Sequence, residues 1–236
     1  MLIQRRGGAL LFVPQRTHAA LAASLMSHWQ LGGLADNPRR EAILTATREH
    51  DEGWAEEDAE LHVGDNGDPL DFVAVPPHVK HRIWPRAAER VAAATSPYVA
   101  ALVAQHALTV HAPLRPQPSW RDFFARMERT RDAYLSRAAP EEAAAAANDY
   151  TFVRIGDQLS LIFCNGWTTP MSGTGFSAGL EGSTLRISPD PFGGRRIPMQ
   201  VEARTLPARS YESSADLRQT YEKAPSLVLE GEAVGA

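Results

Sequence analysis

Apolar residues recur every three or four positions along much of the chain up to residue 164, and this spacing predicts amphipathic helices. Thr17 is a favourable N-cap for a helix that runs to about Trp29. The pair Asn37-Pro38 predicts the N-cap and first residue of a second helix, which we expect to end near Gly53. Further helices are expected at about 78–94, 97–111, 119–138 and 141–164.

The two ends of the chain carry short apolar runs that predict strands. Residues 2–6 and 9–13 flank Gly7-Gly8, a pair suited to a tight hairpin turn. Residues 185–188, 197–203 and 227–230 are expected to be short strands, with one helix at 214–223. Residues 61–77 and 165–182 are rich in turn-forming residues and are interpreted as loops, the first long enough to act as a lid. We therefore expect a mainly α fold, in which a helical bundle carries a small antiparallel β-sheet formed by the N-terminal hairpin and the C-terminal strands.

Composition narrows the classes of protein that the pattern allows. The chain has 236 residues, of which 44% are hydrophobic and 22% charged, and we expect one domain over 1–236. In that domain a helical core at about 15–164 adjoins a β-rich appendage at about 183–232 that packs with the hairpin at 2–13. A net charge of −4 argues against a nucleic-acid partner, and no apolar run reaches membrane-spanning length. A single cysteine, Cys164, fits a reducing compartment, so we expect a cytoplasmic protein.

The adjacent pair His50-Asp51, near the end of the second predicted helix, is the strongest candidate for chemistry. Neutral imidazole and carboxylate together suit first-row divalent metal ions. His18 lies twelve positions before Gln30 and His50 lies twelve positions after Pro38, where a short connection joins the two helices. At 1.5 Å per residue, both histidines lie roughly 18 Å from that connection. We therefore expect His18 to lie beside His50-Asp51.

A carboxylate on an otherwise apolar helix face is a second unusual feature. Asp157 has apolar or aromatic residues four and seven positions away in both directions. A buried carboxylate is costly unless it is paired or coordinated, so either a metal ion or an arginine is expected beside it. His106 has a similar position on its own predicted helix.

The order of these residues resembles the H…HD…D metal signature of the HD-domain superfamily of metal-dependent phosphohydrolases. More narrowly, the chain is similar to an uncharacterised bacterial family labelled as a domain of unknown function, DUF3891. The similar segments are Thr17-His18-Ala19-Ala20-Leu21, Arg48-Glu49-His50-Asp51-Glu52-Gly53-Trp54, Pro69-Leu70-Asp71-Phe72 and Asp157-Gln158-Leu159-Ser160-Leu161. The superfamily resemblance implies an HD-like helical bundle with His18, His50, Asp51 and Asp157 as ligands of a divalent Mn, Fe, Ni or Zn ion.

Roles in catalysis follow from the same resemblance. Asp51 and His106 would be catalytic, with His106 near a second metal or acting as a general acid. Arg48, Lys80 and Arg82 would contact the charged part of the substrate, although Arg48 could instead orient Asp51. The implied activity is hydrolysis of a small phosphorylated molecule. Two alternatives remain: an HD-type di-iron oxygenase that needs His106 as a ligand, and a non-catalytic metal- or ligand-binding regulatory module. Self-association through an exposed sheet edge is compatible with the pattern.

Overall fold

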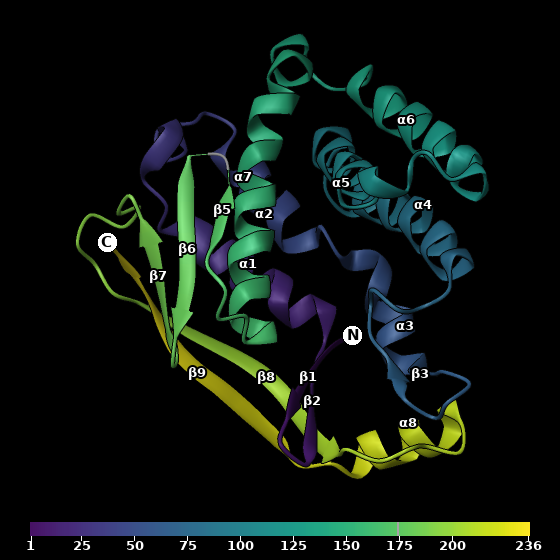
Figure 1. Ribbon diagram of the computed structural model, residues 1–236. Coiled ribbons are helices and arrows are strands. Elements are labelled where there is room, and N and C mark those ends of the chain that lie inside the picture. The colour runs from purple at the N-terminus through teal and green to yellow at the C-terminus, as the bar shows by residue number, and fades with distance from the viewer. Residues whose placement is uncertain (174) are drawn as a thin grey trace.

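The computed structural model describes residues 1–173 and 175–236, and most of the chain up to residue 165 is helical (Figure 1). The helices of the described chain are α1 (Gln15–Ser27), α2 (Arg40–Glu49), α3 (Ala55–Glu60), α4 (Pro77–Ala94), α5 (Pro97–Val110), α6 (Arg121–Leu135), α7 (Pro140–Asn165) and α8 (Ser214–Lys223). Short 3-10 turns connect them at η1 (Leu31–Gly33), η2 (Glu52–Trp54), η3 (Ala112–Leu114) and η4 (Pro118–Trp120).

Local sequence signals account for several helix ends, although two predicted starts were wrong. The Ser96 hydroxyl accepts a hydrogen bond from the Val99 amide at the start of α5, and Gly166 ends α7 in the left-handed conformation. Thr17 is not an N-cap, because α1 begins two residues earlier and the Thr17 hydroxyl donates to the Pro14 carbonyl. Asn37 accepts a hydrogen bond from the Arg39 amide, so α2 begins three residues after it rather than at Pro38.

The strands form a large mixed sheet. The strands of this sheet are β1 (Leu2–Arg6), β2 (Ala9–Val13), β5 (Met171–Gly173), β6 (Phe176–Glu181), β7 (Thr184–Ser188), β8 (Ile197–Pro207) and β9 (Ser226–Gly235). Among the described residues the sheet has seven strands in the order β1-β2-β8-β9-β7-β6-β5, and β7 pairs with β9 in parallel while the other neighbours are antiparallel. A separate ribbon joins β3 (His62–Val63) and β4 (Pro69–Leu70) within the segment predicted to be a loop.

The prediction of a mainly helical bundle with a small antiparallel sheet was therefore wrong. Helices hold 53% of the residues and strands 21%, and the sheet is large and curled. The error began at 165–182, where glycine, serine and proline suggested a loop. Residues 171–173 and 176–181 are strands instead, and side chains along β6 alternate between buried and exposed. Alternating burial is the pattern of a strand with one covered face, and it outweighs the local turn preferences. The division into domains stays a prediction.

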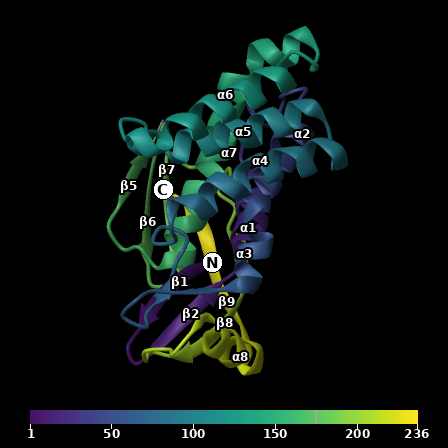
Figure 2. The same cartoon turned by 90° about the vertical axis from the view of Figure 1, so that its right-hand side faces the viewer.

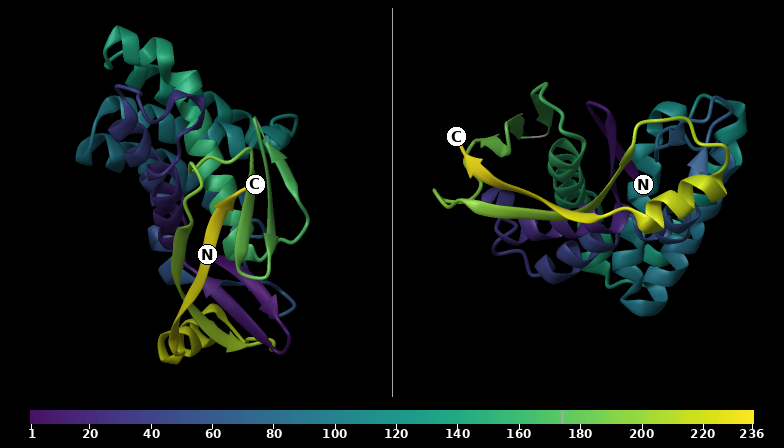
Figure 3. Two further views of the ribbon diagram at one scale, coloured as in Figure 1. Left: turned by 90° about the vertical axis from the view of Figure 1, so that its left-hand side faces the viewer. Right: turned by 90° about the horizontal axis from the view of Figure 1, so that it is seen from below.

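Helices α1 and α7 lie between the sheet and the other helices (Figures 1 and 2). Helix α1 contacts β8, and α7 contacts β1 and β6, while α2 and α5 pack on the α7 surface. At the end of α1, Trp29 contacts Phe176 and Phe192 edge to face, which joins the helical layer to the sheet. Figure 3 shows the sheet curling around this layer, with α8 at the far end of β8. No helix in the described ranges is both long enough and apolar enough to cross a lipid bilayer.

Candidate metal centre

Three histidine rings from different helices meet at the centre of the helical layer. His18 lies in the first turn of α1, His50 follows the last residue of α2, and His106 lies in α5. The ring centroids of His18 and His50 are 5.0 Å apart, and those of His50 and His106 are 4.6 Å apart. All three side chains are buried. The predicted proximity of His18 and His50 is therefore confirmed.

An oxygen atom contacts the Nδ1 atom of each ring. The Nδ1 atom of His50 donates to the Thr47 carbonyl at 2.6 Å, and this carbonyl can only accept. The Nδ1 atom of His18 is 2.9 Å from the Ser160 hydroxyl, which itself donates to the Asp157 carbonyl. The Nδ1 atom of His106 is 3.2 Å from the hydroxyl of Tyr150. Each ring therefore turns its Nε2 atom toward the shared centre, the orientation that supporting residues give to metal-ligating histidines.

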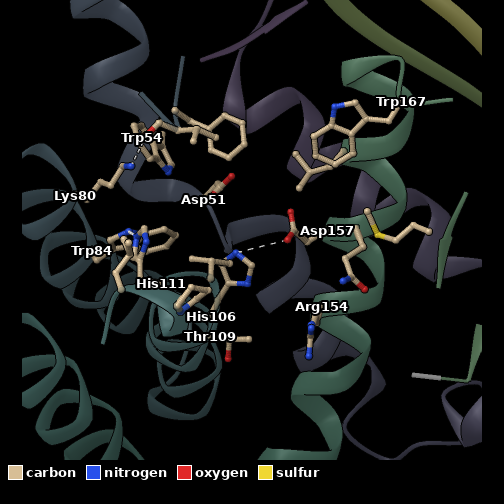
Figure 4. A pocket seen from close by; sticks show the side chains of 18 residues that line it. Asp51, Trp54, Lys80, Trp84, His106, Thr109, His111, Arg154, Asp157 and Trp167 are labelled. Atoms are coloured by element: carbon tan, nitrogen blue, oxygen red, sulfur yellow. Dashed lines mark hydrogen bonds and ion pairs between the residues drawn. The ribbon is translucent and has the colours of Figure 1, made fainter. Parts of the chain in front are cut away.

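Two carboxylates face these Nε2 atoms. The Asp51 Oδ2 atom lies 2.7 Å from His18 Nε2 and 3.6 Å from His50 Nε2. The Asp157 Oδ1 atom lies 3.4 Å from His50 Nε2, and its Oδ2 atom lies 4.0 Å from His106 Nε2. Figure 4 shows Asp51, His106 and Asp157 directed toward one another. Within the described chain no arginine or lysine is paired with Asp157, so histidines fill the position where an arginine was the alternative.

The surroundings of the buried His50 Nε2 atom test whether these residues fit a metal ion. Among the described residues this atom has no hydrogen-bond partner, although it is completely buried. A buried polar atom without a partner is costly, and an ion held between this nitrogen and the two carboxylates would give it one. His18, His50 and Asp157 form one group with ligand atoms within 4.8 Å of one another, and His50, Asp51 and His106 form a second. This donor set of imidazole and carboxylate fits a first-row divalent ion.

The charges of the cluster follow from burial and close pairing. Burial lowers the pKa of His50, but the carboxylates of Asp51 and Asp157 outweigh it and raise that pKa to about 9. Burial raises the pKa values of both carboxyl groups, and the surrounding histidines then hold those values below the usual range. His106 differs, because burial and the nearby charge on His50 lower its pKa to about 4. The apo cluster therefore contains two carboxylates, a charged His50 and a neutral His106.

The cluster forms one wall of a cavity of about 510 Å³. Asp51, His106 and Asp157 line this cavity, while His18 and His50 are buried behind them. Of the residues predicted to contact substrate, Lys80 lines the cavity and donates to the Val73 carbonyl at 2.7 Å. The other two are elsewhere. Arg48 is exposed and is not part of the lining, and Arg82 pairs with Glu57 in a separate surface depression.

Some polar residues of the cavity were not singled out from the sequence, among them Arg154, Gln158 and His111. Arg154 lies on α7 three residues before Asp157, so helical spacing brings it near the same face, and Gln158 lies four residues after Arg154. This spacing was a usable signal. His111 gave none, because it follows the last residue of α5, and only the packing of α4 brings Trp84 Nε1 to donate to its Nε2 atom at 2.8 Å.

Loss of the Ser160 hydroxyl is expected to weaken metal binding. Ser160→Ala removes the oxygen that contacts His18 Nδ1, so the ring loses its fixed orientation and tautomer. Supporting residues of this kind contribute about 10- to 100-fold to metal affinity. Competition of the protein with a chelator for Zn²⁺ measures the change, and Ser24→Ala, an exposed position on α1, is the matched control. Equal affinities for the two variants would contradict this role.

His111 is expected to make the protein sensitive to acid. Burial and nearby cations lower its pKa to about 3, whereas an unfolded chain takes up this proton near pH 6.5. The contribution of neutral His111 to the free energy of unfolding is therefore fully present above pH 6.5 and is lost as the pH falls toward 3. Between pH 7 and 4.5, this group accounts for a loss of about 2.5 kcal/mol. Urea unfolding at both pH values should show that His111→Gln loses less stability than the wild type, while exposed His78→Gln behaves as the wild type. If His111→Gln loses as much stability between the two pH values as the wild type does, His111 is not the source of the acid sensitivity.

Residues 1–208 match the family model described as protein of unknown function (DUF3891), and the chain belongs to this family. The match includes every residue of the cluster and the cavity, and it ends just after β8. The predicted family is therefore confirmed. No curated protein and no solved structure matches the chain significantly.

Proposed function

We propose that the protein is a metal-dependent phosphohydrolase that acts on a small phosphorylated molecule. The observation that carries the proposal is the meeting of three inward Nε2 atoms and two carboxylates at the wall of a cavity. His18, His50, Asp51 and Asp157 would hold the ion. Such an ion polarises a phosphoryl oxygen and lowers the pKa of a coordinated water.

The remaining groups of the cavity suit binding and proton transfer. The pKa of His106 is about 4, so the ring is neutral at pH 7 and does not suit the general-acid role that the resemblance implies. In this proposal its Nε2 atom instead accepts a proton from a reacting water when Nδ1 donates to Tyr150. Lys80 and Arg154 lie on opposite sides of the cluster (Figure 4). Both cations can offset charge on a phosphoryl group.

Metal content and turnover test this proposal together. Protein purified without chelators, or reconstituted with Mn²⁺, Fe²⁺, Ni²⁺ or Zn²⁺, is expected to hold one ion per chain and to release phosphate from aryl phosphates. Asp157→Asn should abolish both, whereas exposed Asp36→Asn should change neither. If the protein acquires no ion, the proposal fails. Stable metal binding with no turnover across phosphomonoesters and phosphodiesters would favour the regulatory module instead.

The position of His106 favours a second candidate function, that of a di-iron oxygenase. Its Nε2 atom is turned inward and belongs to the group formed with His50 and Asp51. The two groups share His50, whose Nδ1 atom is hydrogen-bonded to the Thr47 carbonyl. Only its Nε2 atom can therefore bind an ion in either group. This sharing favours a single ion. Two Fe ions per chain after anaerobic reconstitution, with loss of one in His106→Ala, would instead support the oxygenase.

A further inference from the structure

Most of the cavity wall is apolar, in contrast to the charged cluster on one side. Trp54 from η2 and Phe72 from the segment after β4 contact each other edge to face with centroids 6.5 Å apart. Trp84 of α4 and Leu161 of α7 extend this surface. Large apolar walls with few polar groups are typical of sites for molecules that carry an apolar part.

Exposed apolar side chains gather at the same cavity. Among the described residues, the large hydrophobic side chains with high exposure are Val73, Val110, Trp167 and Val228, at 64%, 40%, 41% and 50%. Val73, Val110 and Trp167 line the cavity and come from three separate segments, whereas Val228 lies on β9 outside the lining. Exposed apolar groups that converge from distant segments indicate a binding surface rather than chance exposure.

The cavity also has two cations that form no ion pair among the described residues. The Arg154 guanidinium is exposed, and in the described chain it has no hydrogen bond or ion pair. Lys80 is buried, which lowers the pKa of its ammonium group, and among the described residues its one hydrogen bond is to the Val73 carbonyl. An anionic group placed beside the cluster would lie between these two cations, while the apolar wall would receive the remainder of the molecule.

We propose that the substrate is an amphiphile, with a phosphoryl head attached to an alkyl or aryl body that lies between Trp54, Phe72 and Trp167. The head-group assignment rests on the proposed function, and the apolar body rests on the cavity wall alone. A volume of about 510 Å³ admits a small molecule of this kind. A sugar phosphate fits poorly, because its hydroxyl groups would lose water without gaining partners on this wall.

Calorimetric titration with non-hydrolysable alkylphosphonates tests the inference without requiring turnover. The full chain, with one equivalent of Zn²⁺, is titrated with butyl-, hexyl- and octylphosphonate, and with 2-hydroxyethylphosphonate as the polar comparison. Each buried methylene is expected to lower the Kd about fourfold. Trp167→Ser should reduce this dependence on chain length, and Val228→Ser is the control at another exposed apolar position, outside the cavity. For the head group, Arg154→Gln should raise the Kd of every phosphonate by a similar factor, and exposed Arg129→Gln should leave these Kd values unchanged.

The outcomes separate this inference from the proposed function. Affinity that does not change with chain length, or no binding of any phosphonate, overturns the amphiphile even if the protein hydrolyses polar phosphoesters. Affinity that rises with chain length and depends on Trp167 supports it, even if no hydrolysis is found. An equal effect of the Trp167 and Val228 substitutions would overturn it, because the apolar body would then bind outside the cavity.

Discussion

Replacing His50 with glutamine is expected to lower the affinity for Zn²⁺ by more than about 100-fold, the upper limit for loss of a mere supporting residue. The Nε2 atom of His50 is buried, has no hydrogen-bond partner among the described residues, and lies 3.4 and 3.6 Å from carboxylates of Asp157 and Asp51. A single ion at this point would use all three groups. Competition with a chelator of known affinity measures the change, and half-buried His28→Gln, outside the cluster, is the control.

The same substitution also removes a positive charge from between two buried carboxylates and so destabilises the fold. Unfolding alone would then lower the Zn²⁺ affinity of His50→Gln. Asp157→Asn separates these effects, because it removes a ligand while it lowers the negative charge of the cluster. We expect Asp157→Asn to unfold at a urea concentration close to that of the apo wild type and still to lose most of its Zn²⁺ affinity. A folded Asp157→Asn protein that binds Zn²⁺ as tightly as the wild type would exclude the proposed ligand set.

Gly156→Ala is expected to destabilise the protein by about 1–3 kcal/mol, the usual range for overpacking a close contact. An alanine in a helix normally stabilises it relative to glycine, so the expected sign is opposite to helix propensity. A Cβ atom at this position would lie 2.8 Å from Met26 Cγ, 2.9 Å from Thr47 Cγ2 and 3.3 Å from the Ala22 carbonyl. Met26 can change rotamer, but Thr47 is β-branched and the Ala22 carbonyl belongs to the α1 backbone, so α7 must move away.

Movement of α7 would also disturb the metal centre, because Asp157 is the next residue and the Thr47 carbonyl holds His50. We therefore expect Gly156→Ala to lose Zn²⁺ affinity as well as stability. Urea unfolding and chelator competition measure the two effects. Gly8→Ala is the control, since a Cβ atom there has no neighbour within 4 Å. If Gly156→Ala is as stable as Gly8→Ala, then α7 does not depend on this close approach.

Helix positions and the family were readable from the sequence because both depend on local signals. Helix α8 begins and ends at the predicted residues, and α4, α5 and α7 begin or end within one residue of their predicted bounds. The proximity of His18 and His50 was also predictable, because neighbouring antiparallel helices place residues at equal counts from their connection at equal heights. The connection, 28–39, extends beyond the predicted one by similar lengths at its two ends, so the two counts stay nearly equal. Asp157 was identified by the cost of placing a carboxylate on an apolar face, and its neighbours are histidines of the cluster.

The sheet and the cavity depend on contacts between residues that are distant in the chain. The parallel pairing of β7 with β9 places Leu185 opposite Ala233, and no local pattern encodes that register. His111 and Trp84 meet because α4 packs on α5. Lys80 and Arg82 lie two positions apart on α4, so helix geometry already places them on opposite faces and excludes both from one cavity wall. Packing decides that Lys80 is the one that faces the cavity, while Arg82 faces Glu57.

The sequence alone thus determined the helices other than α3, the family and the residues able to bind an ion, because periodicity and the cost of burying charge act within single segments. The tertiary structure decided the extent of the sheet, the inward direction of the three Nε2 atoms and the apolar wall that faces them. The sheet depends on pairing between distant strands, and the metal centre depends on packing among α1, α2, α5 and α7, so the energy of these contacts belongs to no single segment.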